Sequence, residues 1–158
     1  MSPERSHYQI SFEEVVSNAK DVMRRDGNYV PILIMEASSN LLIGQIPDMP
    51  ATHGERIELM RFLGQAAAKS GRVDQLQQVF MVFEGWMSTK SAEIRPSQDP
   101  NRKEVLIISA IQMKERKKQI RLFEILRDSH EKVSRSYQWY PSNDKRHYVQ
   151  TLFFCKLN

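Results

Sequence analysis

The sequence predicts an α+β fold in which a largely antiparallel central sheet of about five strands is covered by helices. Two segments begin with helix-capping signals and continue with apolar residues at helical spacing. Short runs rich in β-branched and aromatic residues lie between and after them, and two of these runs are continuously apolar. The expected order is helix, two strands, helix, three strands and a C-terminal element.

The first helix is expected over residues 12–26. Ser11 and Glu14 have the spacing of a capping box, in which a hydroxyl and a carboxylate satisfy free amides at the helix start. Apolar residues then recur every three or four positions. Gly27 can end the helix because glycine adopts the left-handed conformation without strain.

The second helix is expected over residues 53–70. Thr52 and Glu55 form another capping box, and Gly71 is the expected stop signal. This helix is rich in glycine and alanine, and small residues let a helix lie close to a sheet or to another helix.

Two strands are expected between the helices, over residues 29–36 and 41–46. The turn-like residues 37–40 predict that these strands form a hairpin. Strands over residues 77–87 and 104–113 contain the two continuously apolar runs, which are typical of strands covered on both faces. We therefore expect these two strands in the middle of the sheet.

The third strand of the second half is expected over residues 119–128, although residues 121–127 are compatible with strand or helix. Residues 149–157 are apolar enough to close the core as a last helix or an edge strand. The chain of 158 residues is expected to form a single domain over residues 1–158, with residues 1–10 as a disordered tail.

The composition argues against a membrane-spanning or disulfide-stabilised protein. No apolar stretch approaches the length that crosses a bilayer, and the N-terminus carries no secretory signal. Cys155 is the lone cysteine, and its apolar neighbours predict an inert, buried thiol. We therefore expect a cytoplasmic protein with no membrane contact.

Signatures of catalysis and cofactor binding are missing from the sequence. The histidines His7, His53, His130 and His147 are too far apart for a local metal motif. The sequence has no phosphate-binding loop, no dinucleotide fingerprint and no nucleophile elbow. We therefore expect no metal and no cofactor, assign no catalytic residue, and favour a protein that is not an enzyme.

The densest group of chemically active residues lies in the segment 84–104, which joins the two most apolar strands. Its candidate binding residues are Glu84, Trp86, Arg95, Asp99 and Arg102. Two arginines beside an aromatic ring can hold an anion, and Glu84 near Arg95 can act as a general base in an uncatalogued enzyme. The alternative is a structural turn with ion pairs, in which Trp86 caps the core, and we favour this alternative.

A second candidate surface is basic. The net charge is +4 and the pI is near 9.3, which permits contact with nucleic acid. The basic residues of segment 114–121 and the aromatic residues of segment 137–140 can grip a phosphate backbone while bases stack. Acidic residues interrupt the basic segment, which favours an ordinary solvated turn.

A strand–loop–strand segment carries a resemblance to a known family. Glu84-Gly85-Trp86-Met87, followed by Arg-Pro-Ser-Gln-Asp-Pro-Asn-Arg-Lys-Glu-Val at 95–105, resembles a family of uncharacterised bacterial proteins over residues 29–128. That resemblance implies no activity. The element order is also similar to roadblock-like and profilin-like domains, which implies a dimerising or ligand-sensing module.

The sequence does not identify the function, and the most favoured hypothesis is a non-enzymatic, homodimeric interaction or ligand-sensing module. It rests on the missing catalytic signatures and on apolar residues that outnumber what two helices can cover, such as Phe80, Phe83, Phe123 and Phe153. The alternatives are nucleic-acid binding through segments 114–121 and 137–140, and an enzyme with a site in segment 84–104.

Overall fold

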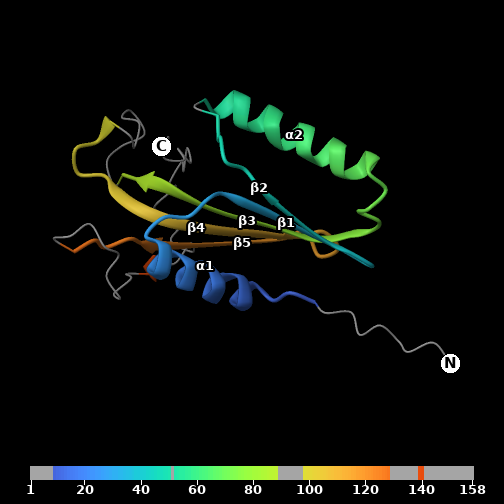
Figure 1. Cartoon of the computed structure of the whole chain (residues 1–158), viewed down its shortest axis with the longest axis horizontal. Coiled ribbons are helices and arrows are strands. Elements are labelled where there is room, and N and C mark those ends of the chain that lie inside the picture. The colour runs from blue at the N-terminus through green and yellow to red at the C-terminus, as the bar shows by residue number, and fades with distance from the viewer. Residues whose placement is uncertain (1–8, 51, 89–97, 129–138, 141–158) are drawn as a thin grey trace.

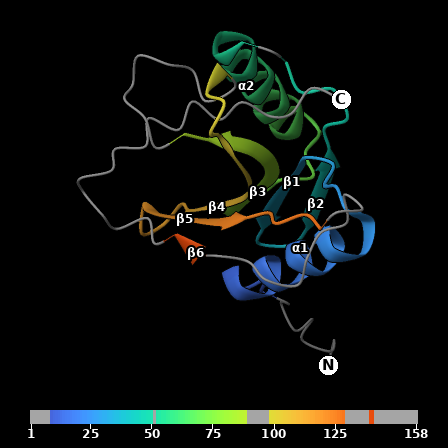
Figure 2. The same cartoon turned by 90° about the vertical axis from the view of Figure 1, so that its left-hand side faces the viewer.

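The sheet of this protein lies between two helices that cover opposite faces (Figures 1 and 2). This arrangement is seen in a computed structural model, which describes residues 9–50, 52–88, 98–128 and 139–140. The described elements follow the expected order, so the α+β prediction is confirmed. Predictions for residues 1–8 and 149–157, and for Cys155, fall outside the described residues.

Helix α1 (Phe12–Asp26) has the predicted bounds and caps. The Ser11 side chain accepts a hydrogen bond from the Glu14 amide at 3.2 Å, and the Glu14 carboxylate accepts one from the Ser11 amide at 2.8 Å. Gly27 ends the helix in the left-handed conformation, with φ of 75°. The buried apolar stripe of α1 faces the sheet and comprises Val15, Val16, Ala19 and Met23.

Helix α2 (His53–Lys69) begins at the predicted capping box of Thr52 and Glu55 and ends one residue before the predicted boundary. Ser70 is the C-cap, and Gly71 follows it with φ of 65°. Only Ala67 of this helix is buried among the residues whose exposure is described. The helix packs on the sheet through half-buried side chains such as Leu59, Met60 and Leu63.

The sheet is antiparallel throughout, with the order β2-β1-β3-β4-β5-β6. The strands are β1 (Ile32–Ala37), β2 (Leu41–Gln45), β3 (Leu76–Met87), β4 (Lys103–Gln112), β5 (Lys117–Glu124) and β6 (Trp139–Tyr140). The predicted hairpin is β1–β2, and the two continuously apolar runs lie in the central strands β3 and β4. Residues 121–127 were compatible with strand or helix, and the structure shows that residues 121–124 are strand, as part of β5.

Alternate residues of the central strands enter two different cores. Phe80 and Val82 of β3 face α1, together with Leu106 and Ile108 of β4. Phe83 of β3 faces α2, with Val105 and Ile107 of β4. This period-two pattern explains why the runs are continuously apolar, because both faces of each strand are covered.

The chain is attached to the sheet at Ile10, before α1 begins. The Ile10 amide donates to the buried Glu36 carboxylate at 3.1 Å, and the Ile10 carbonyl accepts from Gln78 Nε2 at 2.7 Å. Gln78 Nε2 also donates to Glu36 Oε2 at 2.7 Å. These bonds give the buried Glu36 and Gln78 side chains the polar partners that burial requires.

Two features are missing from the residues that the structure describes. No helix there is long and apolar enough to cross a membrane. No group of three or more histidine, cysteine, aspartate or glutamate side chains is placed there to hold a metal ion.

Candidate functional site

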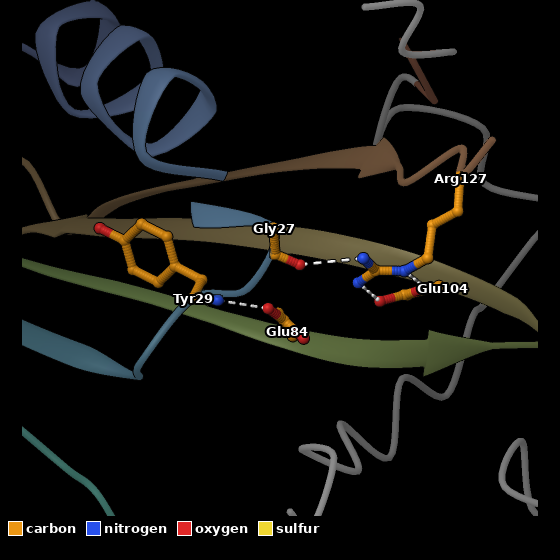
Figure 3. A network of polar contacts seen from close by, with 5 residues as sticks. All are labelled: Gly27, Tyr29, Glu84, Glu104 and Arg127. Atoms are coloured by element: carbon orange, nitrogen blue, oxygen red, sulfur yellow. Dashed lines mark hydrogen bonds and ion pairs between the residues drawn. The ribbon is translucent and has the colours of Figure 1, made fainter. Parts of the chain in front are cut away.

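Glu84 of the predicted loop site lies in β3 and points to the α1 side of the sheet, where it is buried. Its carboxylate accepts a hydrogen bond from the backbone amide of Tyr29, in the segment that joins α1 to β1 (Figure 3). Burial raises the pKa of the Tyr29 phenol from 10.0 to about 12. Glu84 therefore attaches the chain after α1 to the centre of the sheet.

Beside Glu84, an ion pair joins the start of β4 to the chain that follows β5. Arg127 donates from Nε to Glu104 Oε2 at 2.9 Å and from Nη2 to Glu104 Oε1 at 2.5 Å. Its Nη1 atom donates to the Gly27 carbonyl at 3.0 Å (Figure 3). No local sequence pattern predicts this ion pair, because its two members are far apart in the chain.

The other predicted loop residues are divided between a surface stack and a buried turn. The Arg102 guanidinium lies 4.5 Å from the centroid of the half-buried Trp86 ring. Asp99 is only 1% exposed, and it accepts hydrogen bonds from the Ser88 hydroxyl and, at 2.8 Å, from the Asn101 amide. Arg95 lies outside the described residues.

The structure thus brings Trp86 and Arg102 together, while Glu84 and Asp99 each bond to groups that fix the backbone. Asp99 thus holds the turn before β4 in shape, as the structural alternative for this segment expects, whereas Glu84 binds the chain between α1 and β1. Nothing in these contacts assigns chemistry to the segment, and its role as a binding site stays a prediction.

The second predicted surface is divided between the two ends of β5. The side chains of residues 114–118 are exposed at the β4–β5 turn, whereas β6 pairs with Leu122 and Phe123 near the other end of the strand. Arg121 is bound to the Glu13 carboxylate of α1 at 2.6 and 2.7 Å. That hydrogen-bonded arginine lowers the pKa of Glu13. Residues 137 and 138 lie outside the described residues.

A different surface, which the sequence did not single out, lies along strand β2. Among the residues that the structure describes, this strand lies at one edge of the sheet, and two of its apolar side chains are exposed, Leu41 by 45% and Ile43 by 57%. The strand carries no charged residue and no proline. Natural edge strands usually carry charges, prolines or bulges that prevent pairing with another chain, and β2 has neither of the first two.

The backbone of β2 offers hydrogen bonds on its outer side. At the two ends of the β1–β2 ladder, the Ile46 amide donates to the Pro31 carbonyl at 2.7 Å and the Ala37 amide donates to the Asn40 carbonyl at 2.8 Å. Residues alternate between bonded and non-bonded pairs in an antiparallel ladder, so residues 42 and 44 also bond inward to β1. The backbone groups of Leu41, Ile43 and Gln45 consequently point away from the sheet.

A cavity of about 300 Å³ lies between α2 and the β1–β2 hairpin. Most of its walls are apolar, and its only charged lining residue among those described is Arg72. Its lining comprises Leu33, Met35, Leu42, Ile43, Gly44, Gln45, Ile46, Leu63, Ala66, Ala67, Ser70 and Arg72. The available signal in the sequence was the small residues of α2, which leave room beneath the helix.

Comparison with known proteins gives a family but no activity. No curated protein matches the chain, and no solved structure matches it. The likeness to roadblock-like and profilin-like domains therefore stays a prediction. The model of one family matches residues 1–148. Because this match spans nearly the whole chain, the protein belongs to the bacteriophage lambda protein ea47 family.

Proposed function

We propose that this protein is a non-enzymatic interaction module of the cytoplasm that associates with a second copy of itself through the outer edge of β2. The observation that carries this proposal is the uncharged edge strand with Leu41 and Ile43 exposed beside outward-pointing backbone groups. An exposed strand of this kind gains main-chain hydrogen bonds when another strand is added to it.

One symmetric register of two copies uses every outward-pointing residue of this edge. Two identical antiparallel strands related by a twofold axis can be centred on Ile43, so that Ile43 faces the partner's Ile43 and Leu41 faces the partner's Gln45. These are the residues whose backbone groups point outward, and the register therefore uses all of them. Centring the axis on Leu42 would pair Leu41 with the partner's Ile43 but leave Gln45 opposite a residue outside β2, so this register uses fewer of the outward groups.

The side chains support the same register. On the α1 side of the sheet, the exposed Ile43 side chain meets its own copy across the axis, which removes apolar surface from water on both chains. On the α2 side, the partner's Leu42 lies opposite Gly44. A Cβ atom added at Gly44 would meet nothing within 4 Å, so there is space beside this position for a leucine side chain.

Light scattering at micromolar concentration tests the association. The wild-type chain is expected to be a dimer, and Ile43→Lys is expected to be a monomer because it places two like charges opposite each other on the axis. Ile120→Lys is the matched control, since Ile120 is an exposed isoleucine in β5, away from β2. A monomeric wild type would refute the proposal. It would also be refuted if Ile120→Lys were a monomer while Ile43→Lys stayed a dimer.

Disulfide formation tests the register in a Cys155→Ser background. Ile43→Cys alone is expected to cross-link two chains, because the residue faces its own copy at a separation that a disulfide can bridge. Leu41→Cys alone is expected not to cross-link, whereas Leu41→Cys combined with Gln45→Cys is expected to do so. Efficient cross-linking by Leu41→Cys alone would show a different register.

A further inference from the structure

The cavity beneath α2 has the form of a small-molecule site. Its volume of about 300 Å³ lies at the lower end of the range that small-molecule sites occupy. The floor is formed by apolar residues of β1 and β2, including Leu33, Met35 and Leu42, and the roof by Leu63, Ala66 and Ala67 of α2. Such walls favour an apolar chain over water.

The cavity is lined by one cationic residue among those described, Arg72, in the turn that follows α2. The Ser70 hydroxyl donates to the Ala67 carbonyl at 2.6 Å and accepts from the Arg72 amide at 3.2 Å. Asn40 Nδ2 donates to the Arg72 carbonyl at 2.9 Å, which ties the same residue to the β1–β2 turn. The Arg72 backbone is therefore fixed between helix and hairpin, and this residue is both exposed and part of the cavity lining.

We propose that this cavity binds a free amphipathic anion, with an unbranched acyl chain between α2 and the sheet and a carboxylate beside Arg72. A methylene group occupies about the volume of a water molecule, so the cavity holds a chain of about ten carbons. The guanidinium group of arginine recognises carboxylates by its paired donors. This inference does not depend on self-association through β2.

Calorimetric titration at pH 8 with three probes tests the chemistry of the ligand. Decanoate is expected to bind saturably, once per chain. Decyltrimethylammonium, which has the same chain length but a positive charge, and acetate, which lacks the chain, are each expected to bind at least about fivefold more weakly. Equal binding of decanoate and the cation would overturn the role of Arg72, and equal binding of acetate would overturn the role of the cavity.

Two matched substitutions on α2 test the location. Ala66 lines the cavity and Ala68 does not, although both are exposed residues of the same helix. Ala66→Leu is expected to weaken decanoate binding at least about tenfold by filling the space, whereas Ala68→Leu leaves it unchanged. Equal affinity of the two variants would refute the site.

Arg72→Gln provides a test that does not depend on the folding of the Ala66→Leu variant, because Arg72 is exposed. It is expected to weaken decanoate binding about fivefold or more and not to weaken decyltrimethylammonium binding, because the positive charge that repels this cation is removed. An unchanged decanoate affinity would refute the carboxylate position. Sedimentation with phosphatidylglycerol vesicles distinguishes a free ligand from a membrane, and co-sedimentation that Arg72→Gln abolishes would overturn the choice of a free anion.

Discussion

Arg127 binds both carboxylate oxygens of Glu104 while donating a third hydrogen bond to the Gly27 carbonyl at 3.0 Å. Gly27 ends α1, and Glu104 lies at the beginning of β4. A single side chain therefore joins the end of a helix to the centre of the sheet. Both partners of this ion pair are mostly buried, with side chains exposed by 21% and 11%.

Replacing Arg127 with alanine is expected to lower the free energy of unfolding by about 2 to 3 kcal/mol, because the Glu104 carboxylate stays shielded from water without its main partner. Arg61→Ala is the control, since the Arg61–Glu58 pair is exposed by 60% and 68%. The control is expected to cost less than about 0.5 kcal/mol. Urea unfolding measures both changes, and equal effects would contradict a structural role for Arg127.

The phenol of Tyr29 is expected to ionise at about pH 12 in the folded protein, because burial raises its pKa from 10.0. The unfolded chain then loses this proton first. The stability contributed by the protonated phenol is constant below about pH 10 and falls as the pH rises from 10 towards 12. Urea unfolding of wild type and Tyr29→Phe across this range should show a steeper decline for wild type, and parallel curves would be the contrary result.

The stack of Trp86 and Arg102 separates a structural loop from a binding loop. Trp86→Ala is expected to cost about 2 to 3 kcal/mol, less than for a fully buried ring, because the side chain is half-buried. Arg102→Ala is expected to cost about 0.5 to 1 kcal/mol through loss of the cation–π contact. Thermal melts measure both. An unchanged melting temperature for Trp86→Ala would instead make this ring a ligand-binding residue.

The helices could be predicted because their signals are local. Ser11 with Glu14, and Thr52 with Glu55, lie within one helical turn, and both capping boxes form as expected. The central strands were predicted from their continuous apolar runs, which follow directly from coverage on both faces. These features depend on neighbours in the sequence and on burial alone.

The candidate surfaces could not be predicted in the same way because they depend on distant partners. Whether β2 is an edge depends on the chain returning through α2 to place β3 on the other side of β1. The partner of Glu84 is a backbone amide fifty-five positions away, which no side-chain pattern records. Arg72 appears in the sequence as an ordinary basic residue after a helix. Only the folded structure shows that this residue lines a cavity.

The two helices are attached to the sheet by different kinds of contact. On one side of the sheet, α1 is flanked by Ile10, bound to Glu36 and Gln78, and by Gly27, bound to Arg127. On the other, α2 rests on half-buried apolar side chains above a cavity. Local opening should therefore occur first at α2, and its amides should exchange with deuterium while those of α1 remain protected. Slowly exchanging helix amides would then lie on the α1 side of the sheet, and rapidly exchanging ones on the α2 side.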